Sequence, residues 1–279
     1  MSSLPFIQAD GLIKHFPLKA GLFSRSAEKV HAVNGVSLAI EKGQTHGLVG
    51  ESGSGKTTTA RLLLRVIDAD AGSFRFGETP DVFRLGPEEL KKLRRRMQYI
   101  FQDPYTSLNP KMQIRDIVTE PLRYTETAKR FSSPELNDTA SGLLERVGLS
   151  GMDIRKYPHE FSGGQRQRIS IARALSAKPL FIVCDEPVSS LDVSIQSQIL
   201  NLLLDIQEQT GISYLFIAHN LAVVFYLSDY VSVMYAGRIV EAGPSKVLSS
   251  GAIHPYTKLL LDAMPGVRQR GAQAVSDTG

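Results

Sequence analysis

The sequence predicts an α/β fold that combines a mostly parallel sheet with an antiparallel β edge and a helical insert. From residue 180 to residue 235, short apolar runs alternate with segments of helical pattern, which favours parallel strands covered by helices. A glycine-rich loop begins at Gly50, between a buried strand and a helix. Between residues 112 and 159 the apolar side chains recur at helical spacing instead, so this stretch interrupts the alternation.

The N-terminal part supplies the expected antiparallel edge and the start of the parallel sheet. Apolar and polar residues roughly alternate over 6–14 and 33–40, as in half-buried strands, and the basic segment 19–29 between them is expected to be an exposed loop. Pro87, two glutamates and a basic run ending at Arg96 favour a helix between them. The other elements expected here are a strand at 45–49, a helix at 56–66, an edge strand within 69–77 and a strand at 97–101.

The C-terminal part begins with the helical insert, which is expected over about residues 112–162 and is punctuated by prolines. The elements expected after it are strands at 180–185, 213–218 and 230–235, and helices at 165–175, 194–209, 220–227 and 254–263. Residues 266–279 are mostly small or polar, and we expect them to form a disordered tail. The chain is therefore expected to hold one domain over residues 1–265, with the insert inside it.

Composition narrows the class of protein. Of the 279 residues, 42% are hydrophobic and 22% charged, which is enough apolar material for a large core. The longest uninterrupted apolar runs, such as residues 180–184, are far too short to span a bilayer, so any membrane connection is expected through a partner. The only cysteine, Cys184, excludes an internal disulfide and favours the cytosol. A formal charge of +4 is too mild to indicate nucleic acid or an anionic membrane surface.

The loop at residues 50–57 matches in full the Gly-x4-Gly-Lys-Ser/Thr pattern of phosphate-binding loops. It consists of Gly50, Glu51, Ser52, Gly53, Ser54, Gly55, Lys56 and Thr57. Glycines let backbone N–H groups converge on phosphate oxygens, and the following helix adds a positive partial charge. Lys56 is expected to reach the β- and γ-phosphates, Thr57 to bind Mg²⁺ and Thr58 to bond a more distal phosphate. The alternative is a flexible Gly- and Ser-rich loop that contains a lysine by chance and binds no nucleotide. The pattern alone indicates only nucleotide binding, because kinases and GTPases also carry it.

Two acids end the predicted strand at 180–185. In phosphate-loop enzymes an aspartate in this place orients Mg²⁺, usually through water, so Asp185 is the expected metal-binding residue. Glu186 is the better candidate for the general base that positions the attacking water. Successive residues at a strand end point different ways, which suits this division of roles. A helix cap or a plain surface acid after a core strand is the alternative.

Four further motifs carry a resemblance to a family. Residues 161–168, Phe-Ser-Gly-Gly-Gln-Arg-Gln-Arg, resemble the signature motif of ABC-type ATPases, usually written Leu-Ser-Gly-Gly-Gln; Phe161 departs from the commonest form. Gln102 resembles that family's Q-loop, Ser190-Leu191-Asp192 its D-loop and His219 its switch histidine. Together with the phosphate loop these motifs stand in the family's order, and the resemblance covers residues 10–265. It implies a phosphate-loop, RecA-like ABC ATPase core.

The resemblance also implies how the site is completed. ABC subunits pair head to tail, so the phosphate loop of each faces the signature of the other, with ATP and Mg²⁺ between them. The residues that this adds to the ATP site are Ser162, Gly163, Gly164, Gln165 and Asp192. Gln102 and His219 are implied in catalysis, with Lys56 and Glu186, and Gln102 also in Mg²⁺ binding. Phe16 is the implied aromatic that stacks on adenine, with Phe23 as its rival.

A narrower resemblance lies outside the catalytic motifs. Residues 101–110, 157–161, 185–194 and 254–257 are similar to those of the dipeptide and oligopeptide importer ATPases. This similarity implies a peripheral ATPase subunit at the cytoplasmic face of the inner membrane that energises peptide uptake. Its implied partners are a second ATPase subunit, the same or homologous, two membrane-spanning permeases and, indirectly, an extracytoplasmic solute-binding protein, with no nucleic acid. The helical insert and the Gln102 loop are expected to form the groove in which the permeases dock.

Two alternatives stay open from the sequence. Importers of nickel, opines and other small solutes share much of the same pattern, so the solute is not fixed by these residues. A soluble ABC ATPase that acts on nucleic acid is a further alternative, although such proteins usually carry long coiled-coil or zinc-bearing insertions, and this sequence has none.

Overall fold

The computed structural model describes residues 4–17, 29–124 and 131–263. The loop expected at 19–29, with Phe23, falls almost entirely outside these residues, and so does the tail expected at 266–279. Among the described residues, no helix has both the length and the apolar character needed to cross a bilayer.

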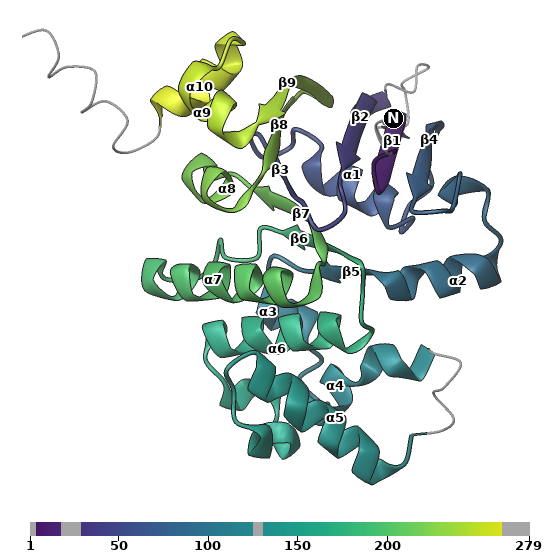
Figure 1. The fold of residues 1–279 in the computed structure, drawn as a ribbon, viewed down its shortest axis with the longest axis vertical. Helices are drawn as coiled ribbons and strands as arrows, with labels where there is room; N and C mark the ends of the chain where they lie inside the picture. The colour runs from purple at the N-terminus through teal and green to yellow at the C-terminus, as the bar shows by residue number, and fades with distance from the viewer. Residues whose placement is uncertain (1–3, 18–28, 125–130, 264–279) are drawn as a thin grey trace, which may run out of the picture.

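Two sheets lie in the upper half of the molecule as Figure 1 draws it, above most of the helices. The smaller is antiparallel, in the order β2-β1-β4, and consists of β1 Ile7–Pro17, β2 Lys29–Ile40 and β4 Ala71–Phe76. The larger has the order β5-β6-β7-β3-β8-β9 and consists of β3 Thr45–Val49, β5 Met97–Ile100, β6 Phe181–Asp185, β7 Ser213–Ala218, β8 Tyr230–Tyr235 and β9 Arg238–Pro244. All its neighbours pair in parallel except β8 and β9. The expected α/β class, with a mostly parallel sheet and an antiparallel edge, is confirmed.

Helices cover the larger sheet and build the insert. The α-helices are α1 Lys56–Leu63, α2 Pro87–Arg96, α3 Pro104–Ser107, α4 Ile114–Val118, α5 Ser133–Arg146, α6 Gly163–Ser176, α7 Val193–Thr210, α8 Leu221–Leu227, α9 Ser245–Gly251 and α10 Pro255–Asp262. Short 3-10 helices span Val82–Arg84, Glu120–Tyr124, Gly151–Arg155 and Pro158–Glu160. Every described element between β5 and β6 is helical, and within residues 112–162 this agrees with the helical spacing of the apolar residues.

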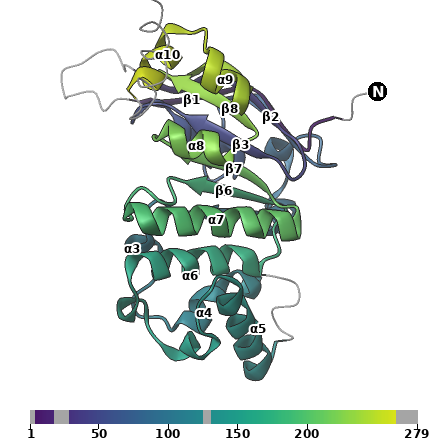
Figure 2. The ribbon, with the colours of Figure 1, turned by 60° about the vertical axis from the view of Figure 1, so that its left-hand side comes forward.

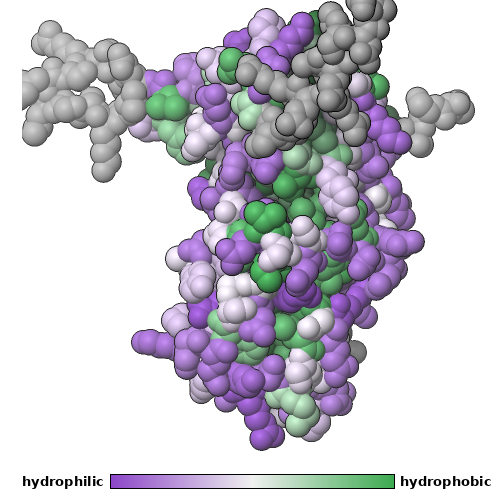
Figure 3. All heavy atoms as spheres, turned by 90° about the vertical axis from the view of Figure 1, so that its left-hand side faces the viewer, coloured by the Kyte–Doolittle hydropathy of each residue, from purple (hydrophilic) through white to green (hydrophobic). Residues whose placement is uncertain are grey.

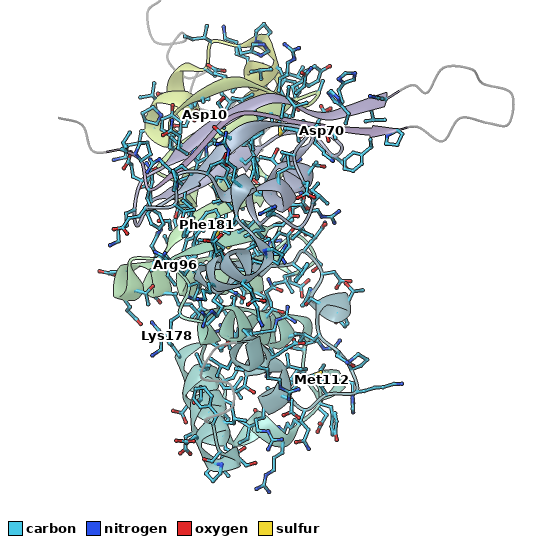
Figure 4. All side chains as sticks on the ribbon, turned by 90° about the vertical axis from the view of Figure 1, so that its right-hand side faces the viewer. Asp10, Asp70, Arg96, Met112, Lys178 and Phe181 are labelled. Atoms are coloured by element: carbon cyan, nitrogen blue, oxygen red, sulfur yellow. The ribbon has the colours of Figure 1, made fainter. Side chains whose placement is uncertain are left out.

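The elements stack in layers, which Figure 2 shows from the side: α7 lies below the larger sheet, α6 below α7, and α4 and α5 lowest. Figure 4 labels Asp10 and Asp70 at the antiparallel sheet, Phe181 and Arg96 near the middle, and Met112 in the helical part. On the face seen in Figure 3, apolar side chains gather in a band down the middle between polar margins.

Two apolar cores lie on opposite faces of the larger sheet, and the central strands contribute side chains to both of them. In β7, Tyr214 and Phe216 belong to the core shared with α6 and α7, whereas Leu215 and Ile217 belong to the core shared with α1 and the antiparallel sheet. Because successive side chains of a strand point to opposite faces, a strand buried on both sides must be apolar throughout. This explains the uninterrupted apolar runs in the sequence.

The structure also differs from the sequence-based expectations. Helix α1 ends at Leu63 instead of residue 66, because the backbone turns into the left-handed region at Arg65, with φ of 48°. The short helix α3, strand β9 and helix α9 were not predicted. Strand β9 returns alongside β8 after Ala236 and Gly237, both at positive φ, which is the conformation that a tight hairpin requires.

His46 joins the two sheets from β3. The ring is 1% exposed; its Nδ1 lies 3.0 Å from the carbonyl oxygen of Ala39 in β2, and its Nε2 lies 2.9 Å from Oγ of Ser232 in β8. A carbonyl oxygen only accepts, so Nδ1 carries the proton and Nε2 accepts from the serine hydroxyl. Burial lowers the pKa of His46 from 6.5 to about 4, although the bond to Ala39 acts in the opposite direction.

The lowered pKa of His46 predicts a pH dependence of stability. The unfolded chain binds this proton more readily than the folded one, so the stabilisation is complete above pH 6.5 and declines as the pH falls toward 4. Between pH 7 and pH 5 the loss is about 2 kcal/mol. Urea unfolding at both pH values measures it, and His46→Gln is expected to lose this part of the difference. An equal pH difference in the two proteins would contradict the assignment.

Candidate functional site

The phosphate loop joins the end of β3 to the start of α1, and its glycines are sterically required. A Cβ at Gly50 would stand 2.1 Å from the carbonyl oxygen of Met234, and one at Gly55 would stand 2.2 Å from that of Ala32. Both residues also have positive φ, 153° and 107°. The loop therefore keeps its shape because its backbone packs directly against the backbone of two other strands.

Lys56 fills the centre of the loop. Its Nζ donates to the carbonyl oxygens of Gly50, at 2.7 Å, and Glu51, at 2.8 Å, and lies 3.3 Å from Oγ of Ser54. Burial lowers the pKa of Lys56, while the carboxylates of Glu186, Asp185 and Glu51 raise it. The ammonium group is thus held inside the loop at the position where phosphate oxygens bind in loops of this pattern.

The start of α1 suits an anion. The N-cap residue Gly55 provides no side-chain cap, and the first turn contains no acidic residue, so the first N–H groups of the helix keep their positive partial charge. An anionic ligand with several oxygen atoms fits such a helix end, and a phosphate chain is the ligand typical of it.

A hydroxyl and a carboxylate meet at the base of the loop. Thr57 Oγ1 lies 3.3 Å from Oδ1 of Asp185, whose other oxygen accepts a hydrogen bond from the Tyr99 hydroxyl. Burial and the neighbouring carboxylate raise the pKa of Tyr99, so its hydroxyl stays protonated and donates. Hydroxyl and carboxylate oxygens are ligands that Mg²⁺ prefers, so Thr57 and Asp185 fit that ion.

Glu186 stands at the mouth of the loop in an unusual conformation. Its φ is 48°, in the left-handed region, and its N–H donates to the carbonyl oxygen of Ile217 at 2.8 Å. Gln102 Nε2 donates to Oε2 of Glu186 at 2.9 Å, and His219 Nδ1 lies 3.3 Å from the same oxygen. A carboxylate only accepts, so Nδ1 carries the histidine proton in this contact. Gln102 and His219, which lie far from Glu186 in the sequence, thus contact the same oxygen atom of its carboxylate.

These groups surround one cavity of about 550 Å³. The lining residues are Val30, His31, Ala32, Ser52, Gly53, Gly55, Lys56, Thr57, Thr58, Gln102, Glu186, His219, Ala236 and Gly237. The structure therefore brings the phosphate loop, Gln102, Glu186 and His219 together. The wall formed by β2 and the β8–β9 turn was missed, because no local motif marks it.

Phe16 is not among the residues that line this cavity. Its side chain is 39% exposed, with the Lys14 Nζ 5.7 Å from the ring centroid, and it pairs across the antiparallel sheet with Val30, which does line the cavity. The rings that the lining does include are the imidazoles of His31 and His219, and the His31 centroid lies 4.1 Å from that of His15.

The signature motif forms a second helix start, at α6. Ser162 is its N-cap, with Oγ accepting from the Gln165 N–H at 3.4 Å, and Gln165 Oε1 accepts in return from the Ser162 N–H at 2.9 Å. A Cβ at Gly164 would stand 2.5 Å from Cγ2 of Ile195 in α7. The glycine therefore allows the two helices to approach closely where α6 begins.

The signature stands apart from the cavity. None of Ser162, Gly163, Gly164, Gln165 and Asp192 belongs to its described lining. Ser162, Gln165 and Asp192 are instead exposed, and α6 lies with the helical insert while α1 lies among the strands (Figure 1). One chain thus presents two separate helix starts suited to anions.

The C-terminal segment 254–257 reaches the phosphate loop. Tyr256 Oη accepts a hydrogen bond from the Glu51 N–H at 3.0 Å, and its ring centroid lies 4.5 Å from that of Tyr235. The Glu241 carboxylate accepts from the N–H groups of Ile253 and His254 and so ties the same segment to β9. Helix α10 is therefore anchored beside the site.

The sequence of this chain is similar to those of a known protein family. Residues 33–189 match the family described as ABC transporter. The chain is 49% identical over 259 residues to the probable peptide ABC transporter ATP-binding protein y4tS of Sinorhizobium fredii (strain NBRC 101917 / NGR234), covering 93% of this chain and 72% of that protein. It is 46% identical over 260 residues to the oligopeptide transport ATP-binding protein AppF of Bacillus subtilis (strain 168), covering 93% and 78%.

A third relative is longer than this chain. The glutathione import ATP-binding protein GsiA of Escherichia coli (strain K12) is 50% identical over 262 residues, which are 94% of this chain and 41% of that protein. Among solved structures, the dimeric post-hydrolysis state of the ATP-binding cassette MJ0796 bound to ADP and Pi superposes with a TM-score of 0.74 and 25% identity, covering 86% of this chain and 98% of that one. The fold of cbiO1 from Clostridium perfringens is similar, with a TM-score of 0.74 and 24% identity, over 89% of this chain and 92% of that one.

Proposed function

Because the chain belongs to the ABC transporter ATP-binding family, we propose that it is the ATP-hydrolysing subunit of an importer that takes up peptides or similar small solutes. The observation that carries the ATPase part is the convergence of Lys56, Glu186 and His219 on one cavity. The names of the relatives, which include a peptide, an oligopeptide and a glutathione transport protein, support the solute class.

The proposed nucleotide site follows from the loop geometry. The triphosphate lies along residues 50–58, where Lys56 contacts the β- and γ-phosphates and the start of α1 supplies N–H donors. Thr57, Asp185 and the amide oxygen of Gln102 would hold Mg²⁺, which supplies charge neutralisation at the phosphates. Adenine stacks beside Phe16 or on the β2 wall next to it, where His31 lies.

In the proposed hydrolysis, the water oxygen bonds to the γ-phosphorus, the bond to the bridging oxygen breaks and ADP leaves. Glu186 accepts the proton of this water, while Lys56 and His219 stabilise negative charge on the γ-phosphate. The contact between Gln102 and Glu186 is proposed to open before this step, which frees Oε2 of the carboxylate for the water. Catalysis thus depends on a movement of the Gln102 loop, which follows β5.

A second ATPase subunit, identical or homologous, would complete each site. In the proposed head-to-tail pair, Ser162, Gly163, Gly164 and Gln165 of one chain meet the γ-phosphate held by the other, with Asp192 close by. Two features support this: the signature residues do not line the cavity of their own chain, and the similar MJ0796 cassette is dimeric with ADP and Pi. Closure of the pair on ATP and its opening after hydrolysis would then drive transport.

The membrane partners are proposed to bind beside the Gln102 loop. A groove of about 650 Å³ lies there, lined by Pro87, Glu88, Lys91, Arg94, Arg95, Gln98, Tyr99, Phe101, Glu120, Pro121 and Arg173. It runs between α2 and the helical insert, and Phe101 directly precedes Gln102, so a short cytoplasmic segment of a permease bound there would press on the site. Two permeases and an extracytoplasmic binding protein complete the proposed importer.

We place the subunit at the cytoplasmic face of the inner membrane, held there by its permeases. The ATPase domain is proposed to span residues 1–265 and to contain the helical insert at about 112–162.

Replacing the proposed base separates binding from turnover. Glu186→Gln is expected to bind ATP as the original chain does, while phosphate release falls by a factor of about 10² to 10⁴, since the amide cannot accept the proton. Gel filtration with ATP and Mg²⁺ is expected to show the variant trapped as a pair. Glu208→Gln, an exposed site on α7, is the matched control and is expected to hydrolyse ATP normally. Normal turnover by Glu186→Gln would show that another group is the base.

Uptake measured in membrane vesicles tests the solute class. When the chain is co-expressed with its permeases and binding protein, ATP-dependent uptake of a labelled short peptide is expected, and it should stop when Glu186→Gln replaces the original subunit. Nickel ions and an opine serve as competing solutes. Uptake of either of these without uptake of peptide would overturn the peptide assignment and leave the ATPase assignment intact.

A further inference from the structure

Tyr99 contacts Asp185 from a neighbouring strand. It lies on β5, which pairs in parallel with β6, and its hydroxyl donates to Oδ2 of Asp185. The other oxygen, Oδ1, faces Oγ1 of Thr57 at 3.3 Å. The carboxylate is therefore held between two hydroxyl groups, and only one of them belongs to a motif of the phosphate site.

The ring of Tyr99 faces the groove beside α2. Its centroid lies 4.5 Å from that of Phe101, with the rings at 60°, and both residues line the groove. Phe101 is 47% exposed and has the Arg173 guanidinium 5.9 Å from its ring centroid. A single side chain thus has its hydroxyl on Asp185 and its ring in the wall of the proposed docking groove.

We propose that Tyr99 is a positioning residue that fixes the Asp185 carboxylate for Mg²⁺ and transmits occupation of the groove to it. This inference rests on the proposed function, in which Asp185 and Thr57 serve the metal. The hydrogen bond to Oδ2 fixes the rotation of the carboxylate and so turns Oδ1 toward Thr57 and the phosphate loop. A shift of Phe101 caused by a bound segment is passed to the Tyr99 ring that packs against it, and the hydroxyl oxygen moves with that ring because the two form one rigid planar unit.

The test measures metal-dependent nucleotide binding with no turnover. Binding of a fluorescent ATP analogue to the purified chain is followed without metal and during titration with Mn²⁺, which replaces Mg²⁺ and allows the bound ion to be observed by electron paramagnetic resonance. Tyr99→Phe removes only the hydroxyl. The Mn²⁺ concentration at half-saturation is expected to rise about tenfold, the usual effect of removing a hydrogen-bond partner of a metal ligand, with metal-free binding unchanged.

Tyr214→Phe is the matched control. Its hydroxyl is also buried in the larger sheet, but it donates to the carbonyl oxygen of Leu203, at 3.2 Å. Thermal unfolding of both variants is compared, so a general loss of stability is distinguished from an effect on the metal. If Tyr99→Phe shows the same Mn²⁺ dependence as the original chain and the control, the positioning role is overturned. If the original chain itself binds no nucleotide, the proposed function fails instead.

Phe101→Ala tests the connection to the groove. This variant keeps the Tyr99 hydroxyl but removes the ring that packs against it. A smaller rise in the Mn²⁺ concentration, about threefold, is expected with the same resonance signature as Tyr99→Phe. An unchanged Mn²⁺ dependence in Phe101→Ala would overturn the link between groove and metal site.

Discussion

The parallel register of four neighbouring strands is the constraint on which the site depends. Val49 of β3 is level with Ala218 of β7, Ile217 of β7 with Asp185 of β6, and Cys184 of β6 with Ile100 of β5. Each strand therefore ends at the same edge of the sheet, and the residues just beyond these ends are Gly50, His219, Glu186 and, one further on, Gln102. Ligands of open α/β sheets bind at such an edge. The two cores that bury this sheet on both faces hold the register and, with it, the site.

The contacts at that edge fit the proposal that a nucleotide and a second chain complete the site. Lys56 is enclosed by carbonyl oxygens of its own loop, with the carboxylates of Glu186, Asp185 and Glu51 near it. In the proposed function a triphosphate replaces these internal contacts. Glu186 is shared by Gln102 and His219 at rest, which keeps the proposed base occupied. The signature at the start of α6 has no contact with this cavity. A γ-phosphate that binds both helix starts would therefore join two chains.

The sequence predicted the parts of the site that short motifs encode. A phosphate loop needs glycines, a lysine and a hydroxyl at fixed spacing, so residues 50–58 could be predicted as a phosphate site without a structure, as could a role for Asp185 and Glu186 where β6 ends. Contacts between distant strands leave no such pattern. The wall that includes His31 and the bond from Tyr99 to Asp185 depend on which strands become neighbours, and β9 depends on a turn at Ala236 and Gly237. The adenine contact was assigned to Phe16 by resemblance alone, and the cavity lining includes its partner Val30 instead.

The composite site is tested most directly by mixing two inactive variants. Lys56→Ala disables a phosphate loop and Ser162→Arg disables a signature, so neither variant alone is expected to hydrolyse ATP. In an equal mixture, some pairs contain one chain of each variant. Such a pair has one site that carries both defects and one site that is intact. The mixture is therefore expected to show up to about a quarter of the original ATPase activity. If mixed pairs form and remain inactive, Lys56 and Ser162 serve the same site within one chain, and the account is wrong.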